Sequence, residues 1–237
     1  MSQLAAVVFD FDGIIMDSET PEYESHRRVF EQYGASLTTS DWCHQIGIWN
    51  DAQDERWFRE LCRRCSNAPD SRTFLAEKRR IFDEVAPREP MRGVRELVEA
   101  LAAAGIPAAI ASSSSAWWIR RAVERIGMGR QFAAIVTGDE VERRKPAPDV
   151  YLEAARRVGV DPADVVAIED SAPGIAAARA AGMATVAIPH WLTERHDLSG
   201  ADLRVANAGE LTLPRLAALV SSRLRPQTSA TRGNAKR

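Results

Sequence analysis

The sequence is poor in cysteine and in lysine, and it contains no long apolar run. Its three cysteines, Cys43, Cys62 and Cys65, cannot all pair with one another, so no disulfide framework holds the chain together. No apolar stretch approaches the roughly 20 residues that a membrane-spanning helix needs, which excludes a transmembrane protein. The segment MSQLAAVVFD lacks the basic and long apolar regions of a signal peptide, so we expect a cytoplasmic protein.

The charges of the chain nearly balance. There are 31 basic and 33 acidic residues, which gives a formal net charge of −2, and 45% of the residues are hydrophobic. This balance argues against nucleic acids and membrane surfaces as partners, because both attract proteins through bulk positive charge. Any charged ligand must therefore be recognised by a few local groups. Among the basic residues only Lys78, Lys145 and Lys236 are lysines.

Short runs rich in Val, Ile and Ala alternate with helical patterns over much of the chain. The runs at 5–9, 107–111, 133–136, 165–168 and 184–188 are typical of buried strands. Helical periodicity is found at 93–104, 116–126, 148–158 and 172–181, and a glycine directly follows each of these segments. The alternation predicts an α/β fold, a Rossmann-like parallel sheet with helices on both faces.

The long gap between the first two predicted strands shows only helical periodicity. Because ligands bind at the carboxyl ends of the strands in such sheets, a module inserted after the first strand is placed to cover the site. We therefore predict a discontinuous core of residues 1–16 and 91–224 and a small α-helical cap of residues 17–90. Residues 225–237 are polar and lack periodicity, so we expect a disordered tail.

Two predicted strands end in pairs of acidic residues. Asp10 and Asp12 follow the first strand, and Glu169 and Asp170 follow the fourth. Turn or helix-capping aspartates would explain one such pair. Acidic groups this close at the edge of a sheet would repel each other unless a divalent cation or a shared proton offset their charge. Carboxylate oxygens are ligands that Mg²⁺ prefers, so the pattern favours a magnesium site.

The other two strand ends carry groups that suit a phosphate. The second strand runs into Ser112 and Ser113, the first of four serines, whose hydroxyls and backbone N–H groups can bind an anion beside a helix start. A simple serine-rich helix cap is the alternative. Lys145 follows the third strand, where a compact point charge in an arginine-rich chain indicates a specific role. The alternative for Lys145 is a solvated charge run, since two arginines precede it.

These motifs together resemble those of the haloacid dehalogenase superfamily of phosphatases and phosphomutases. All four family motifs occur in order: DFDGIIMDSE at 10–19, the apolar run ending at Ser112, Lys145 in KPAPDVY, and IEDSAPGIAAARAAGM at 168–183. The resemblance covers most of residues 5–190. The helical insertion is similar to the small C1-type cap of the β-phosphoglucomutase-like subgroup.

The resemblance implies a Mg²⁺-dependent phosphohydrolase that cleaves a small-molecule phosphate monoester. Asp10 would be the nucleophile that forms an aspartyl-phosphate. Asp12 would act as general acid towards the leaving oxygen and as general base for water. Mg²⁺ would be held by the Asp10 carboxylate, the Asp12 backbone carbonyl and Asp170, with Glu169 as a nearby or water-mediated partner. The groups that stabilise the transferring phosphoryl oxygens would be Ser112, Ser113 and Lys145.

Other activities on the same fold are less compatible with the residues. The dehalogenase branch of the superfamily lacks the second aspartate, which is present here as Asp12. A β-phosphoglucomutase-type sugar phosphomutase is the main alternative, but its cap carries a basic residue where residues 47–51, GIWND, have none. We therefore expect hydrolysis over isomerisation. An inactive fold used as a binding module is disfavoured because every catalytic position holds the expected residue type.

Possible substrate contacts in the cap are Trp49, Asn50 and Lys78. Trp49 would offer a flat or apolar surface, and its alternative is a place in the core of the cap. Lys78 could reach the cleft, or form a Schiff base as in phosphonate-cleaving relatives, but a solvated helix face is the favoured interpretation. We expect the Cys62-Arg-Arg-Cys65 segment to hold buried structural thiols, the alternative being a zinc site.

Overall fold

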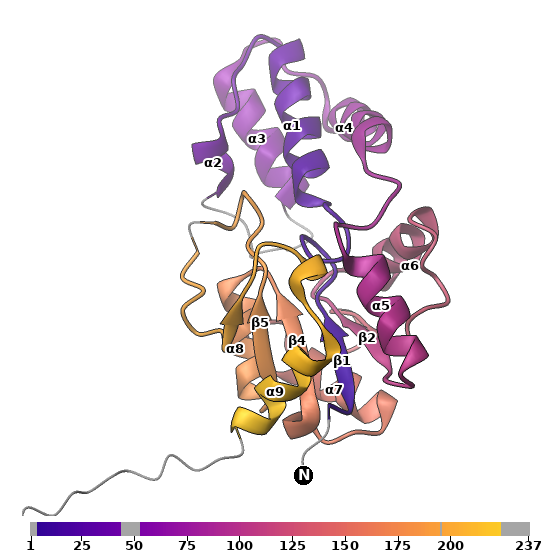
Figure 1. Ribbon diagram of the computed structural model, residues 1–237. Coiled ribbons are helices and arrows are strands. Elements are labelled where there is room, and N and C mark those ends of the chain that lie inside the picture. The colour runs from indigo at the N-terminus through magenta and orange to yellow at the C-terminus, as the bar shows by residue number, and fades with distance from the viewer. Residues whose placement is uncertain (1–3, 44–52, 195, 224–237) are drawn as a thin grey trace, which may run out of the picture.

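The centre of the molecule is a parallel sheet, as the computed structural model of residues 4–43, 53–194 and 196–223 shows (Figure 1). Its strands lie in the order β3-β2-β1-β4-β5-β6. They are β1 (Ala6–Phe9), β2 (Ala108–Ala111), β3 (Ala134–Val136), β4 (Val165–Glu169), β5 (Ala184–Ala187) and β6 (Leu203–Arg204). β1 pairs with both β2 and β4, so the carboxyl ends of these three strands are neighbours at one edge of the sheet.

Helices cover both faces of the sheet. α5 (Val94–Ala103), α6 (Ala116–Arg125) and α9 (Leu213–Arg223) pack on one face, and α7 (Asp149–Val158) and α8 (Ala172–Ala180) pack on the other. The predicted Rossmann-like α/β core is therefore confirmed. Gly159 ends α7 in the left-handed conformation, with φ 74°, as the glycine after that periodic segment predicts. The two-residue strand β6 is too short to leave a pattern in the sequence.

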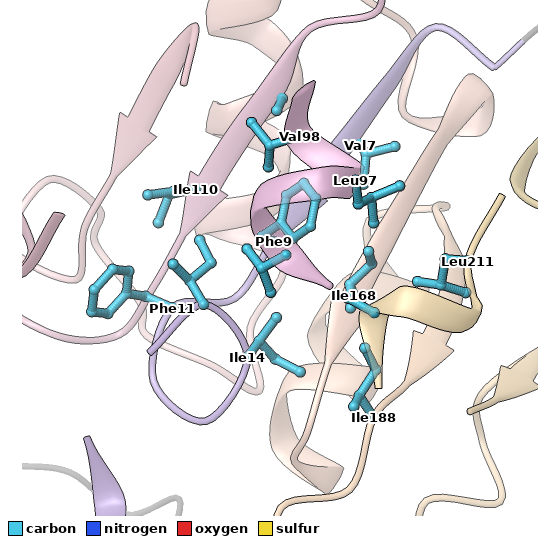
Figure 2. Packing of buried hydrophobic residues seen from close by; sticks show 14 of the residues in the cluster. Val7, Phe9, Phe11, Ile14, Leu97, Val98, Ile110, Ile168, Ile188 and Leu211 are labelled. Atoms are coloured by element: carbon cyan, nitrogen blue, oxygen red, sulfur yellow. The ribbon is translucent and has the colours of Figure 1, made fainter. Parts of the chain in front are cut away.

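The hydrophobic core follows from the alternation of side chains along β1. Val7 and Phe9 face the α5 side, whereas Ala6 and Val8 face the α7 side. All four side chains are completely buried. Figure 2 shows Phe9 at the centre of the first layer, among side chains of α5, β2 and β4. Burial on both faces explains why the strand reads as a continuous apolar run.

The described part of the cap, between β1 and α5, contains four helices. They are α1 (Glu19–Gln32), α2 (Thr39–Cys43), α3 (Gln53–Arg64) and α4 (Ser71–Val85). Their common core is aromatic, and in it Trp42 stacks on Trp57 with ring centroids 5.1 Å apart. In Figure 1 these helices lie beyond the end of the sheet at which β1 ends. Trp49 and Asn50 lie outside the described residues, as does the predicted tail.

The chain passes from core to cap and back at adjacent points. The Met91 amide donates to the Ile15 carbonyl at 2.8 Å. This hydrogen bond joins the segment that leaves the core to the segment that returns to it. Beside them the Arg125 guanidinium of α6 donates to the carbonyls of Asp83, Ala86 and Pro87 at 2.9–3.1 Å. These contacts fix the last turn of α4 against the core. Within the described ranges, none of the helices is long and apolar enough to cross a membrane.

Candidate active site

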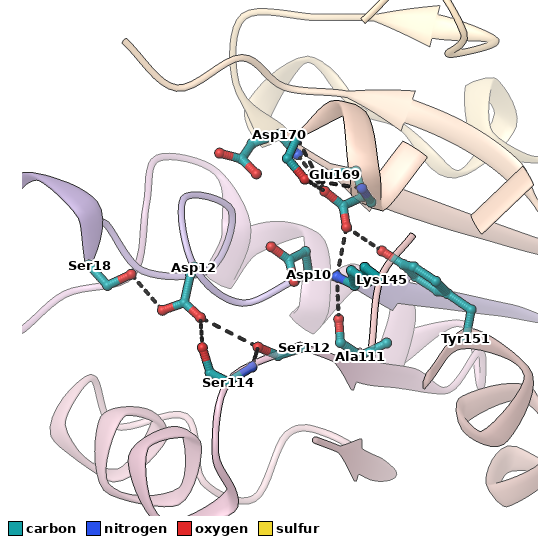
Figure 3. A network of polar contacts seen from close by, with 12 residues as sticks. Asp10, Asp12, Ser18, Ala111, Ser112, Ser114, Lys145, Tyr151, Glu169 and Asp170 are labelled. Atoms are coloured by element: carbon teal, nitrogen blue, oxygen red, sulfur yellow. Dashed lines mark hydrogen bonds and ion pairs between the residues drawn. The ribbon is translucent and has the colours of Figure 1, made fainter. Parts of the chain in front are cut away.

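The predicted catalytic residues meet where the strands end. Asp10 directly follows β1, Ser112 directly follows β2, and Glu169 is the last residue of β4. Lys145, from the segment between β3 and α7, donates to Asp10 Oδ1 at 2.6 Å. Figure 3 shows Asp12 and Asp170 in the same group. The shared edge of a parallel sheet thus brings together residues that are up to 160 positions apart in the sequence, from 10 to 170.

The buried ammonium of Lys145 connects several groups of this site through hydrogen bonds. Its Nζ atom donates to Asp10 Oδ1 at 2.6 Å, to Glu169 Oε1 at 2.7 Å and to the Ala111 carbonyl at 2.9 Å, which uses all three N–H groups. Its side chain is only 7% exposed, so the alternative of a solvated charge run is wrong. Burial opposes the charge, but the carboxylates of Asp10 and Glu169 outweigh it and raise the pKa of Lys145 above its ordinary value.

Both carboxylate oxygens of Glu169 are fully engaged. Oε1 accepts from Lys145 and from the Tyr151 hydroxyl at 2.7 Å. Oε2 accepts from the Asp170 and Ser171 amides at 3.1 and 3.2 Å and from the Ser171 hydroxyl at 3.0 Å. A Cβ on Gly174 would lie 1.8 Å from Oε1, so only glycine lets α8 begin this close. Glu169 was a candidate direct metal ligand, but its carboxylate instead orients Lys145.

Asp10 and Asp170 leave a concentration of negative charge beside this network. Ligand atoms of Asp10, Glu169 and Asp170 lie within 4.8 Å of one another. Burial raises the pKa of Asp10 to about 7, and Glu169 and Asp12 act in the same direction against Lys145. Burial and its acidic neighbours also raise the pKa of Asp170 well above its usual range. These are carboxylates whose ionised forms need a cation, so the donor set fits a hard divalent ion.

The backbone after β1 is shaped to admit the Asp170 carboxylate. Gly13 has φ 81°, in the left-handed region, and a Cβ there would lie 2.6 Å from Asp170 Oδ2. Glycine is therefore required both by the turn and by the close approach. The same Oδ2 accepts from the Thr193 hydroxyl at 3.2 Å, which fixes the carboxylate from the far side.

Asp12 lies apart from the Asp10–Asp170 pair and is held by a different set of donors. Its Oδ1 accepts from the Ser18 hydroxyl at 2.6 Å and from the Trp118 indole N–H at 3.0 Å. Its Oδ2 accepts from the Ser114 hydroxyl at 2.6 Å and more weakly from Ser112 at 3.4 Å. Figure 3 shows the Asp12 side chain between Ser18 and Ser114. Ser115 in turn caps α6, accepting from the Trp118 amide, so the capping alternative holds for that serine.

A cavity of about 400 Å³ lies between these groups and the cap, which is the size of a small-molecule site. Asp10, Asp12 and the serines line it on the core side, with Ser113 among them. Lys78 lines the cap side, within ion-pair distance of Glu22 and 2.9 Å from Asp54. Its side chain is only 12% exposed, so the interpretation of Lys78 as a solvated helix face is wrong.

The sequence patterns do not identify several residues of the site. Ser18 and Tyr151 lie inside recognised motifs, each six residues after Asp12 or Lys145, and Ser114 belongs to the run of four serines after the second strand. Trp118 and the acidic cap partners of Lys78 left no signal. The expected buried thiols are also wrong for Cys62, which is exposed, while Cys65 is half-buried. No cysteine belongs to the candidate metal clusters found among residues that the structure describes.

The fold and this site define a phosphohydrolase: a Rossmann-like core with acidic strand ends and a buried lysine, beneath a helical cap. A sequence model described as haloacid dehalogenase-like hydrolase matches residues 7–188. The chain belongs to this family, as a member of the β-phosphoglucomutase-like subgroup.

Individual relatives agree with that assignment. The chain is 35% identical over 211 residues to a Bacillus subtilis (strain 168) protein named "Putative phosphatase YhcW", covering 89% of this chain and 94% of that protein. It is 33% identical over 185 residues to the phosphorylated carbohydrates phosphatase of Thermotoga maritima, covering 76% and 82%. A crystal structure titled "putative beta-phosphoglucomutase", also from Thermotoga maritima, has a TM-score of 0.73 and 30% identity, with 92% and 99% of the chains covered.

Proposed function

We propose that the protein is a Mg²⁺-dependent phosphatase that hydrolyses a small-molecule phosphate monoester through an aspartyl-phosphate on Asp10. The observation that carries this proposal is the position of Asp10. Its carboxylate lies at the end of β1, 2.6 Å from the Lys145 ammonium, at the base of a cavity that the cap covers. A buried carboxylate beside a fixed cation is suited to attack a phosphorus atom whose oxygens that cation neutralises.

The reaction takes two steps that share one acid–base group. In the first, an Asp10 carboxylate oxygen bonds to phosphorus, the bond to the ester oxygen breaks, and Asp12 gives that oxygen a proton. In the second, water attacks the phosphorus of the aspartyl-phosphate, Asp12 takes the water proton, and the Asp10–phosphorus bond breaks. Asp12 is suited to this role because it lines the same cavity as Asp10.

The carboxylates of Asp10 and Asp170 would hold the metal, together with the backbone carbonyl of Asp12. A bound Mg²⁺ would supply charge neutralisation for the phosphoryl oxygens. The Glu169 oxygens already accept from five donors. We therefore assign Glu169 the role of orienting Lys145 and the Asp170 backbone, instead of direct ligation.

Ser112, Ser113 and Lys145 would bind the phosphoryl group. The Ser112 hydroxyl accepts from the Ser114 amide at 3.0 Å, which orders the loop after β2. Ser113 lines the cavity. Lys145 is fixed by its two other partners and contributes a point charge that does not have to reorganise as charge develops.

We also propose that residues 17–90 form a cap domain on a discontinuous core of residues 1–16 and 91–224. The hydrogen bond between the Met91 amide and the Ile15 carbonyl would mark the boundary between the two parts. Lys78 would contact the leaving group from the cap side. The free thiols of Cys62 and Cys65 are in keeping with a reducing compartment, and we place the enzyme in the cytoplasm.

The test is phosphate release from p-nitrophenyl phosphate and a panel of phosphorylated metabolites, with Mg²⁺ and with EDTA. Wild type should release phosphate only with the metal, and Asp10→Asn should abolish release while remaining folded. Asp197→Asn, the same change at an exposed aspartate of the core, is the matched control and should retain full activity. Mg²⁺-independent release, or an active Asp10→Asn variant, would contradict the proposal.

A sugar phosphomutase is the second candidate, since the Thermotoga maritima neighbour bears that title. Two cavity-lining arginines, Arg79 on α4 and Arg121 on α6, offer the positive charge that a second phosphate would need. The same preparation decides between the two activities. Glucose 1,6-bisphosphate-dependent interconversion of sugar phosphates that is faster than phosphate release would show a mutase.

A further inference from the structure

We propose that Trp118 is a positioning residue for the reaction, one that fixes the acid–base group Asp12 and determines which of its oxygens carries the proton. This rests on the phosphatase function proposed above. The carrying observation is the indole N–H of Trp118, which donates to Asp12 Oδ1 at 3.0 Å from α6, across the sheet edge from β1.

The chemistry of the donors distinguishes the two oxygens of Asp12. An indole N–H can only donate, whereas a serine hydroxyl can donate or accept. Oδ1 accepts from both the Trp118 indole and the Ser18 hydroxyl, so both of its lone pairs are used and a proton there would displace one of these donors. Oδ2 faces the Ser114 hydroxyl at 2.6 Å, which can rotate and accept instead. The proton that passes to the leaving oxygen, and the one later taken from water, accordingly resides on Oδ2.

The indole is itself fixed by packing from both parts of the molecule. Phe82, on cap helix α4, meets the Trp118 ring edge to face, with centroids 5.4 Å apart and planes at 73°. Trp118 also lies in the first turn of α6, which begins at the Ser115 cap. The aromatic contact therefore links the position of the cap helix to the orientation of the Asp12 carboxylate.

The neighbouring tryptophan provides a matched control. Trp117 also lines the cavity, but its side chain is 66% exposed and lies beneath the Arg121 guanidinium, 5.7 Å from ring centroid to Cζ. The hydrogen bonds found for Asp12 in the described parts of the chain do not include Trp117. Trp117→Phe and Trp118→Phe are thus the same chemical change at the same cavity, and only the second removes a donor from Asp12.

The experiment measures kcat/KM for phenyl phosphates whose leaving groups differ in basicity, from p-nitrophenyl to unsubstituted phenyl. Because kcat/KM covers the steps up to release of the leaving group, it reports on proton donation and not on hydrolysis of the intermediate. A nitrophenolate needs little protonation and a phenolate needs more. Misplacing the general acid should therefore cost more with the poorer leaving group, within the 10²–10⁴-fold that such a group contributes.

For Trp118→Phe we expect kcat/KM on phenyl phosphate to fall about tenfold further than on p-nitrophenyl phosphate, which makes the dependence on leaving-group basicity steeper. Trp117→Phe should keep the wild-type slope. Phe82→Leu, which removes the ring that aims the indole, should steepen the slope in the same direction, and it decides the question if Trp118→Phe does not fold.

The outcomes separate this inference from the proposed function. A wild-type enzyme without Asp10-dependent activity would overturn the phosphatase function itself. An active wild type whose slope is unchanged in folded Trp118→Phe, or steepened equally in Trp117→Phe, would overturn the role of Trp118 alone. A uniform loss on all leaving groups would show a merely structural tryptophan and also overturn it.

Discussion

Removing the hydroxyl of Tyr151 tests whether the buried hydrogen bonds around Glu169 stabilise the active site. In the Tyr151→Phe variant the ring keeps its place on α7, and the only loss is the O–H that donates to Glu169 Oε1 at 2.7 Å. Burial and the adjacent Glu169 raise the pKa of Tyr151 well above its usual range, so the hydroxyl is a donor at any working pH. Both partners are completely buried, and the lost bond has no ready substitute.

The size of the effect follows from the charge of the acceptor. A hydrogen bond to a charged group contributes about 1.5–3 kcal/mol to stability. For a chain of this length, 1 kcal/mol corresponds to roughly 2–4 °C in Tm, so we expect a fall of about 3–12 °C. Phosphatase activity should fall as well, because Glu169 orients Lys145.

Urea unfolding measures the loss of stability: the midpoint of the Tyr151→Phe variant should be lower than that of the wild type, at an unchanged m-value. The matched control is Tyr33→Phe, whose hydroxyl donates to Glu77 at 3.2 Å on the half-buried surface of the cap. Charged contacts that are partly open to solvent contribute about 0–1 kcal/mol. Equal losses in the two variants would refute the reasoning that the buried Glu169 network stabilises the fold.

Three further predictions concern the metal site and the link to the cap. Gly13→Ala should raise the Mg²⁺ concentration needed for half-maximal activity at least several-fold, because its Cβ would displace Asp170; a Mg²⁺ titration measures this. In EDTA, the free energy of unfolding should fall as the pH rises from about 4 towards 7, because folded Asp10 holds a proton that the unfolded chain releases, and Asp10→Asn should flatten this slope in urea titrations. Arg125→Met should lower stability by about 1–3 kcal/mol and speed limited proteolysis at residues 83–87, since it leaves carbonyl oxygens there without donors.

The sequence predicted the core well because its elements follow local rules. The first five strands are continuous apolar runs, buried on both faces, and each lies within about one residue of its predicted bounds. Helices α5 to α8 were likewise indicated by periodicity and by glycines such as Gly159. β6 has two residues, one of them exposed, and a segment so short carries no periodicity.

The cap was predicted as helical, but the surroundings of its side chains were not. Lys78 was expected to be solvated because two arginines follow it, and it is instead buried against Glu22 and Asp54. Cys62 was expected to be buried and is exposed. On an amphipathic helix the buried face is set by which neighbours pack against it, and here those neighbours come from α1 and α3, whose angles to α4 the sequence does not encode locally.

By itself the sequence determined the class of the fold and the main chemical groups of the site, because Asp10, Lys145 and the acids after β4 stand at strand ends, and parallel strands of one sheet end at one edge. Only the tertiary structure decided how those groups are used. It showed that Glu169 is saturated by donors, and that Asp12 is turned towards Trp118 instead of Asp170. Such choices depend on hydrogen-bond distances and angles between distant elements, which arise from the packing of the whole sheet and cap and leave no pattern in the local sequence.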